Sequence, residues 1–137
     1  MTQPFLDTYV IIRFLTGDDL EKQAAAATLF EQVEQGVLTL HAPDTVIADA
    51  VYVLSSPRLY HVARADIREM LSALVRLSQF QVQNKQSVLR ALDLYAATTL
   101  DFGDTLIIAS MERQGSHLLY SYDQGFDRIK DITRQQP

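Results

Sequence analysis

A chain of 137 residues, of which 47% are hydrophobic, is long enough for one domain with a substantial core and too short for two. Seventeen acidic and twelve basic residues give a formal net charge of −5, which excludes nucleic-acid binding by bulk positive charge. The absence of cysteine excludes disulfides, thiolate catalysis and cysteine-ligated zinc. No apolar run approaches the roughly 20 residues of a membrane span, and a signal-peptide pattern is missing, so we expect a single cytoplasmic domain over residues 1–137 with no membrane partner.

Short apolar runs, typical of buried strands, alternate along the chain with longer patterns at helical spacing. The first run is ambiguous, because residues 4–7 predict a strand and "TYVIIRFL" (8–15) either continues it or begins a helix. The remaining elements are expected, in chain order, to be a helix from Leu20 to Gln35, a strand at 37–42, helices from Asp44 to Leu54 and Val62 to Leu77, a strand at 79–83, a helix from Lys85 to Ala97, a helix following "DFGD" and running to Gly115, a strand at 116–121, a turn, and a tail that frays from Thr133.

This succession of strands and helices, without an internal repeat or a linker, predicts the α/β fold class. We expect a three-layer sandwich in which helices flank a mostly parallel central sheet. In open parallel sheets, ligands bind beyond the carboxyl ends of the strands, which directs attention to the residues that follow each strand.

Four aspartates occur in apolar surroundings. Asp7 follows the first strand, and Asp123 follows the last strand in the same relative position, so both are expected at the edge where the strands end. Asp104 lies in the first turn of an apolar helix, and Asp49 is the only charged residue of "TVIADAVYVL". Carboxylates gathered in a partly buried pocket repel one another and therefore favour a bound cation; all-oxygen ligation suits Mg²⁺ or Mn²⁺.

Each acid also has a purely structural interpretation. Asp101 is a good helix N-cap, which is favoured over a site role, and Asp104 taken alone would be a partner of the helix dipole. Asp49 alternatively is a paired buried acid or lies on the exposed stripe of a half-buried helix. Asp127 belongs either to the outer part of a site or, with more support, to a turn.

A cation bound by these carboxylates would polarise a phosphoryl oxygen and lower the pKa of a bound water, so the combination predicts phosphodiester hydrolysis. With His41 and His117 in apolar strands and no cysteine, the sequence offers no convincing nucleophilic triad. A phosphatase or phosphoacceptor domain would also place an aspartate after the first strand. The phosphatase needs a second aspartate where Tyr9 stands, and the phosphoacceptor needs a lysine that "SHLLYSYDQGF" lacks.

The segments "FLDTYVIIRFLTGDD", "APDTVIADAVYVL" and "DFGDTLIIASMERQGSHLLYSYDQGFDRI" resemble the corresponding parts of PIN-domain proteins of the VapC toxin type, over nearly the whole chain. The resemblance implies a ribonuclease that depends on Mg²⁺ or Mn²⁺ and carries an acidic quartet at the end of a parallel sheet. By motif, the catalytic and metal-binding residues would be Asp7, Asp49, Asp104 and Asp123, surrounded by Thr8, Asp101 and Asp127.

Two residues depart from the family pattern. Asp49 stands where the family usually has glutamate, and the loss of one methylene shortens its reach by about 1.5 Å. Tyr9 stands where the family usually has asparagine, and its ring would fill part of the cleft or stack on a base. Both departures also fit an alternative function, a PIN-like domain with decayed nuclease activity that binds RNA or a protein.

Arginines near the predicted site are candidates for RNA contacts. Arg13 lies about one helical turn past Asp7, and Arg58 lies in the middle of the chain; together with Tyr9 they form the predicted RNA-binding set. Arg64 and Arg68 belong to the same region, but they are interpreted equally well as helix-face residues paired with Glu69 or Asp66. The resemblance also implies a homodimer and a small antitoxin protein whose tail enters the acidic groove.

Overall fold

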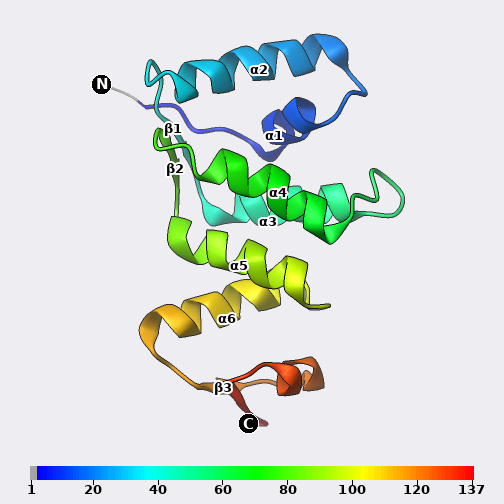
Figure 1. Ribbon diagram of the computed structural model, residues 1–137, viewed down its shortest axis with the longest axis vertical. Helices are drawn as coiled ribbons and strands as arrows, with labels where there is room; N and C mark the ends of the chain where they lie inside the picture. Colours follow the sequence, from blue (N-terminus) through cyan, green and yellow to red (C-terminus); the bar gives the residue numbers. More distant parts are fainter. Residues whose placement is uncertain (1–2) are drawn as a thin grey trace.

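The computed structural model describes residues 3–137 (Figure 1). Within this range the helices are α1 (Thr8–Leu15), α2 (Leu20–Glu34), α3 (Asp44–Ser55), α4 (Arg64–Val75), α5 (Lys85–Ala97) and α6 (Phe102–Gln114), the strands are β1 (Leu40–Ala42), β2 (Phe80–Val82), β3 (Leu118–Tyr120) and β4 (Thr133–Gln135), and a 3₁₀ helix, η1 (Gln124–Arg128), lies between the last two strands. Among the described residues, the helices are all too short or too polar to span a bilayer.

Local sequence signals account for the ends of several helices. "TYVIIRFL" forms helix α1, which resolves the ambiguity of the first apolar run, and it begins directly after Asp7. The Asp19 carboxylate caps α2 by accepting a hydrogen bond from the Lys22 backbone N–H at 3.1 Å. Gly115, with φ of +70°, ends α6 in the left-handed conformation that glycine adopts without steric cost.

The strands pair in parallel, which confirms the predicted α/β class with parallel strands. β1 pairs with β2 in the register Leu40↔Phe80, and the predicted first strand contributes only a single bridge, from Phe5 to His41. β3 pairs with β4, so the expectation of a frayed tail from Thr133 is wrong. Within residues 3–137 the strands form two separate pairs, and no backbone pairing joins them.

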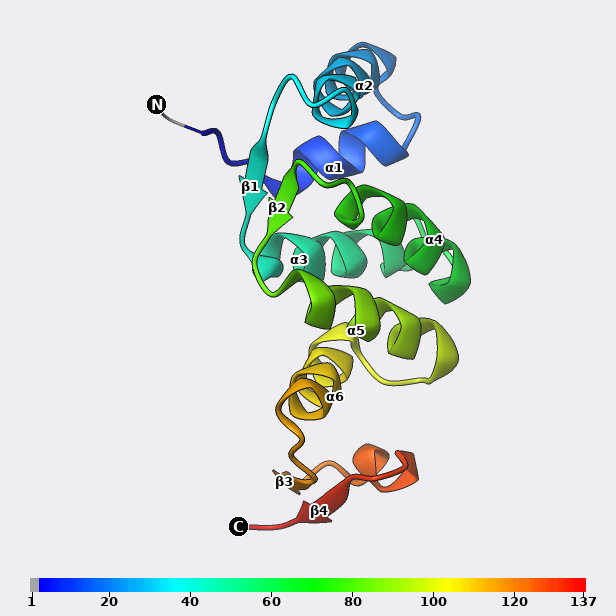
Figure 2. The ribbon, with the colours of Figure 1, turned by 60° about the vertical axis from the view of Figure 1, so that its left-hand side comes forward.

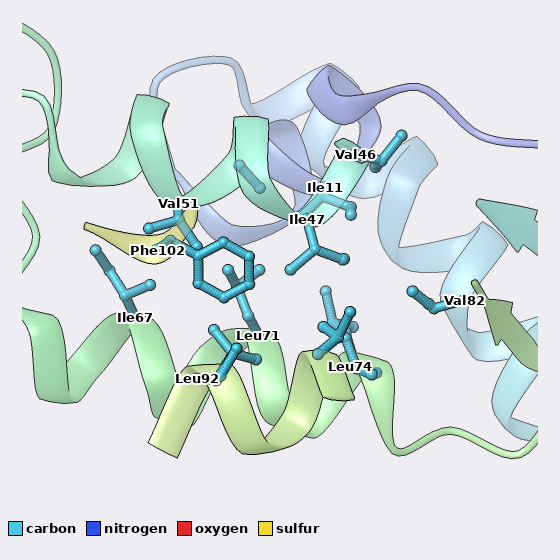
Figure 3. Close-up of a cluster of buried hydrophobic side chains, with 14 of the residues drawn as sticks. Ile11, Val46, Ile47, Val51, Ile67, Leu71, Leu74, Val82, Leu92 and Phe102 are labelled. Atoms are coloured by element: carbon cyan, nitrogen blue, oxygen red, sulfur yellow. The ribbon is translucent and has the colours of Figure 1, made fainter. Parts of the chain in front are cut away.

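The core lies where helices from different parts of the chain meet. Side chains from α1, α3, α4, α5, β2 and the start of α6 converge in it, and several of them are inaccessible to solvent (Figure 3). Phe102, at the start of α6, packs among them and ties this helix to the rest of the core. Burial of side chains of this size stabilises the fold by about 1.5–3 kcal/mol each.

The elements stack along the long axis of the molecule in an order close to that of the chain. Helices α1 and α2 lie at one end, α3 and α4 follow, then α5 and α6, and the pair β3–β4 lies at the far end (Figures 1 and 2). We call residues 116–137 the C-terminal unit. It lies on the far side of α6 from β1 and β2.

Arg64 holds the connection between α5 and α6. Its guanidinium donates hydrogen bonds to the backbone carbonyls of Tyr95, at 2.8 Å, and of Leu100, and it lies 3.7 Å from the centre of the Tyr95 ring. These carbonyls end α5 and precede α6, so Arg64 supplies partners to groups that the helix itself leaves unbonded. Arg68 pairs with Asp93 at 2.8 Å and with Glu69 at 3.5 Å. Both arginines therefore have structural partners.

Asp18 connects the turn after α1 to the loop before α4. Its carboxylate accepts hydrogen bonds from the Tyr60 hydroxyl at 2.5 Å, the Thr16 hydroxyl at 2.9 Å and the Arg13 guanidinium at 3.2 Å. The Tyr60 bond, followed by the Thr16 bond, lowers the pKa of Asp18. Because the pKa is lower in the folded than in the unfolded protein, this stabilisation is present above the ordinary pKa of aspartate and is lost as the pH falls through the folded value.

We therefore expect Tyr60→Phe to lower the urea midpoint of unfolding at about pH 6, and to change it less at about pH 2.5, because the charge of Asp18 is progressively lost as the pH falls through its folded pKa. Urea unfolding of both proteins at the two pH values measures the difference. A Tyr60→Phe effect that is equal at both pH values would show that the Asp18 charge does not contribute.

Candidate functional site

Asp104 is positioned by the first turn of α6. Asp101 is the N-cap residue of this helix by its extended backbone, and its carbonyl accepts the Thr105 N–H at 3.0 Å. Thr105 is fully buried, and its hydroxyl donates to the Phe102 carbonyl at 2.8 Å, which fixes the turn from inside the core. The Asp101 carboxylate makes no capping hydrogen bond. The predicted capping position is confirmed, but the charged group is not used to cap the helix.

Asp123 lies in the loop between β3 and η1. Its backbone N–H donates to the Ser121 hydroxyl at 3.0 Å, and its carboxylate oxygen Oδ1 accepts the Gly125 N–H at 2.8 Å. Asp123 is thus the N-cap of η1, and this capping holds its side chain at the loop surface.

Asp104 and Asp123, far apart in the sequence, lie close enough for their charges to interact. Partial burial raises the pKa of Asp104, and the negative charges of Asp123 and Asp101 raise it further. The structure thus brings together three of the predicted site residues: one proposed catalytic pair and the flanking Asp101. A carboxylate with this environment is a favourable partner for a cation, since a positive charge relieves both the repulsion and the cost of desolvation.

Gly125 is required by the close approach of its backbone to Asp123. A Cβ atom at this position would lie 3.0 Å from Asp123 Oδ1 and 3.3 Å from a methyl carbon of Leu100. A methyl group here would push the carboxylate away from its capping position or displace the loop before α6.

We expect Gly125→Ala to lower the free energy of unfolding by about 1–2 kcal/mol because of this overpacking. Gly103→Ala is the matched control, because no atom lies within 4 Å of a Cβ at that position and alanine is favoured inside a helix. Urea unfolding of the two variants measures the difference. Equal free energies of unfolding for the two variants would show that the loop carrying Asp123 shifts to accommodate the methyl group without loss of stability.

Asp127 is engaged in an ion pair within the C-terminal unit. Arg134 Nε and Nη2 donate to its two carboxylate oxygens at 2.8 and 3.1 Å, and Arg134 Nη1 donates to the Ser121 carbonyl at 3.1 Å. The hydrogen bond from Arg134 holds the pKa of Asp127 below its ordinary value. Asp127 thus organises the unit that carries Asp123. Arg134 lies between two exposed residues of β4, and nothing in the sequence around it indicates this contact.

Asp7 lies in a different part of the molecule, at the start of α1 (Figures 1 and 2). Its side chain is exposed and lines a cavity of about 520 Å³ between α1 and α2, together with Tyr9, Val10, Arg13, Lys22, Ala25, Ala26 and Leu29. Thr8 is buried, and its hydroxyl is 3.5 Å from the Val46 carbonyl. The sequence signals only that Lys22 lies in the first turn of α2; the structure shows that its side chain lines the same cavity as Asp7.

Asp49 is exposed on α3, so it lies on the solvent stripe of a half-buried helix. Among residues 3–137, no three histidine, aspartate or glutamate side chains come close enough to hold one metal ion. Within the described chain the charges of Asp123 and Asp101 act on Asp104, but these three acids do not form a metal-binding cluster by themselves, and Asp7 and Asp49 do not belong to this group.

The three residues predicted to contact RNA lie on the surface near α1 and α3. Arg13 is shared between Asp18, at 3.2 Å, and the face of the Tyr9 ring, whose centre is 5.9 Å from the guanidinium carbon. Tyr9 is half exposed, and Arg58 is exposed in the loop between α3 and α4. The cavity beside Asp7 therefore combines two cations and an aromatic ring with apolar side chains.

Comparison with known proteins identifies the family of this chain. The sequence model of the PIN domain matches residues 5–132, and the chain belongs to the PIN domain family. Within this class, the chain is similar to a protein of Aquifex aeolicus (strain VF5) named VapC ribonuclease, with 29% identity over 124 residues that cover 90% of each chain.

Proposed function

We propose that this protein is a ribonuclease that hydrolyses RNA phosphodiester bonds with Mg²⁺ or Mn²⁺, and that it is the toxin of a toxin–antitoxin pair. Membership of the PIN domain family and similarity to a protein named VapC ribonuclease support the class of reaction. The observation that carries the proposal is the position of Asp104, which is partly buried beside the negative charges of Asp123 and Asp101.

The donor atoms available are carboxylate oxygens, which suit Mg²⁺ or Mn²⁺ better than zinc or copper. Asp104, Asp123 and Asp7 would hold the cation with Asp49 nearby, which requires Asp7 and Asp49 to approach the Asp104–Asp123 pair, from which they are separated within one chain. When bound, the cation supplies positive charge for the scissile phosphate and lowers the pKa of an attacking water.

The remaining functions belong to residues of the chain. Asp49 would orient a water or accept its proton from the side of α3, with Asp101 and Asp127 as supporting groups. Arg13 and Arg58 would contact phosphates, and Tyr9 would stack on a base. A local contribution of this kind is needed because the net charge of −5 repels RNA at long range.

The cavity beside Asp7 is the proposed binding place for the antitoxin. It is lined by apolar residues of α1 and α2 and by both an acid and two cations, which suits a partner with apolar and charged side chains. Occupation of this cavity would cover Asp7 and block access of RNA to it.

A cleavage experiment tests the proposal. Total RNA is incubated with the protein in Mn²⁺ or in chelator, and new RNA ends are mapped by sequencing, because a toxin of this type can be selective for few sites. We expect new ends that require Mn²⁺ and are absent with Asp104→Asn. Ends that form equally in chelator would contradict a cation-dependent reaction.

A second candidate is a PIN-like module that binds RNA or a protein without cleaving. It is favoured by Tyr9 and Asp49 in place of the usual asparagine and glutamate, and by the lack of three convergent acids among residues 3–137. RNA binding without Mn²⁺-dependent ends in the same experiment would support it over the ribonuclease.

A further inference from the structure

Among residues 3–137, strand β3 pairs with β4 along one edge, and its other edge has no strand beside it. In its pairing with β4, the His117 carbonyl and the Ser121 N–H make the bonds at either end of the strand. Because successive residues of a parallel strand direct their backbone groups to opposite sides, Leu118 and Tyr120 direct theirs to the other edge. Their side chains are 47% and 61% exposed, which is unusual for an apolar strand in a parallel arrangement.

A second unused edge lies at residues 4–6. The Pro4 carbonyl accepts the His41 N–H at 2.9 Å, and the Leu6 N–H donates to the His41 carbonyl at 3.0 Å. Phe5 between them directs its N–H and carbonyl away from β1, and neither has a backbone partner among residues 3–137. The Phe5 side chain is 71% exposed. Residues 4–6 run parallel to β1, and the exposed Phe5 side chain makes their free edge apolar.

The two edges of one chain cannot meet while α6 keeps its packing. Only residues 115–117 connect α6 to β3, and three extended residues span about 10 Å. Helices α3, α5 and α6 lie between β3 and the edge at residues 4–6 in both views (Figures 1 and 2), and each packed helix adds about 8–10 Å. Helix α6 is held in place by buried Phe102 and Ile108 and by the ion pair of Arg90 with Glu112 at 2.8 Å.

We propose that the two edges are joined between two copies of this chain, so that β3 of each copy lies beside residues 4–6 of the other. The directions of the free backbone groups set the register. Phe5 N–H donates to the Leu118 carbonyl of the second copy, and the Tyr120 N–H of the second copy donates to the Phe5 carbonyl, which pairs Phe5 with Leu119. Because each copy offers one edge of each kind, the exchange closes into a two-fold dimer and leaves neither edge free.

The exchange has a consequence for the active site that rests on the proposed function. Asp7 follows the strand at residues 4–6, and Asp123 follows β3, so parallel pairing brings them to the same end of the joined sheet. Asp104 accompanies Asp123, since their charges already interact within one copy. Each site would thus contain Asp7 of one copy with Asp104 and Asp123 of the other.

Cysteine cross-linking tests the pairing without reference to activity, because the natural chain contains no cysteine. Neighbouring residues of paired strands lie at a separation that a disulfide can bridge. We expect a mixture of the Phe5→Cys and Leu119→Cys proteins to form a covalent dimer on mild oxidation, in much larger yield than either protein alone. A lack of cross-linking in the mixture would overturn the proposal. So would a disulfide within single chains of a protein that carries both Phe5→Cys and Leu119→Cys.

Complementation tests the shared site. Asp7→Asn and Asp104→Asn proteins are each expected to be inactive, and refolding them together from urea would give mixed dimers with one intact site of two. At equal amounts we expect about a quarter of the parent activity, since half of the dimers are mixed. An active parent with no recovered activity in the mixture would overturn the shared site. An inactive parent with successful cross-linking would instead count against the ribonuclease and leave the exchange supported.

Discussion

An Asp7→Asn protein is expected to cleave RNA at least about 100-fold more slowly than the parent, equivalent to about 2.7 kcal/mol of lost transition-state stabilisation. Asparagine keeps the size of the side chain and removes the charge that would hold a cation. Because Asp7 is exposed and makes no capping hydrogen bond in α1, the substitution should leave the stability nearly unchanged. Initial rates of RNA cleavage, together with urea unfolding, measure both effects.

Asp19→Asn is the control for this substitution. It removes one negative charge at the next helix, and asparagine caps a helix about as well as aspartate. We expect this control to cleave RNA at nearly the parent rate. An Asp7→Asn protein as active as the control would refute a catalytic role for Asp7.

Replacement of Arg64 by methionine is expected to lower the free energy of unfolding by about 3 kcal/mol. Hydrogen bonds from a charged group contribute about 1.5–3 kcal/mol, and the cation over the Tyr95 ring contributes about 0.5–2 kcal/mol. Methionine keeps most of the apolar stem but leaves the Tyr95 and Leu100 carbonyls without their donor. Denaturant unfolding measures the loss.

Arg76→Met is the matched control, because Arg76 is exposed at the end of α4 and has no ion pair among residues 3–137. Its effect should stay within about 0.5 kcal/mol. If both substitutions lower the free energy of unfolding equally, the contacts of Arg64 with the two carbonyls do not stabilise the fold, and Arg64 is better interpreted as an ordinary helix-face residue.

Local patterns predicted the elements of this fold because they act over a few residues. The "DFGD" segment and Gly115 located α6, and with it the position of Asp104 in the first turn. The contacts of Arg64 were not predictable, because its carbonyl partners lie 31 and 36 residues further along the chain. The same holds for the Arg134 pair with Asp127, since nothing in β4 marks which acid its guanidinium will face.

The candidate site was predictable only where local patterns place its residues. Asp104 and Asp123 were placed after a helix start and after a strand, and the structure brings them near each other. Whether Asp7 joins them depends on which strand edges pair, and periodicity along one strand does not specify its neighbour. Two free edges, at Phe5 and at β3, therefore leave this part of the site to be decided by assembly.

Calorimetric titration of Mn²⁺ into the purified protein, with Asp104→Asn beside it, tests most directly whether these carboxylates form a cation site. We predict saturable binding to the parent that is weakened at least about tenfold, or ~1.4 kcal/mol, by the substitution. No saturable binding to the parent, or equal binding by both proteins, would contradict the account.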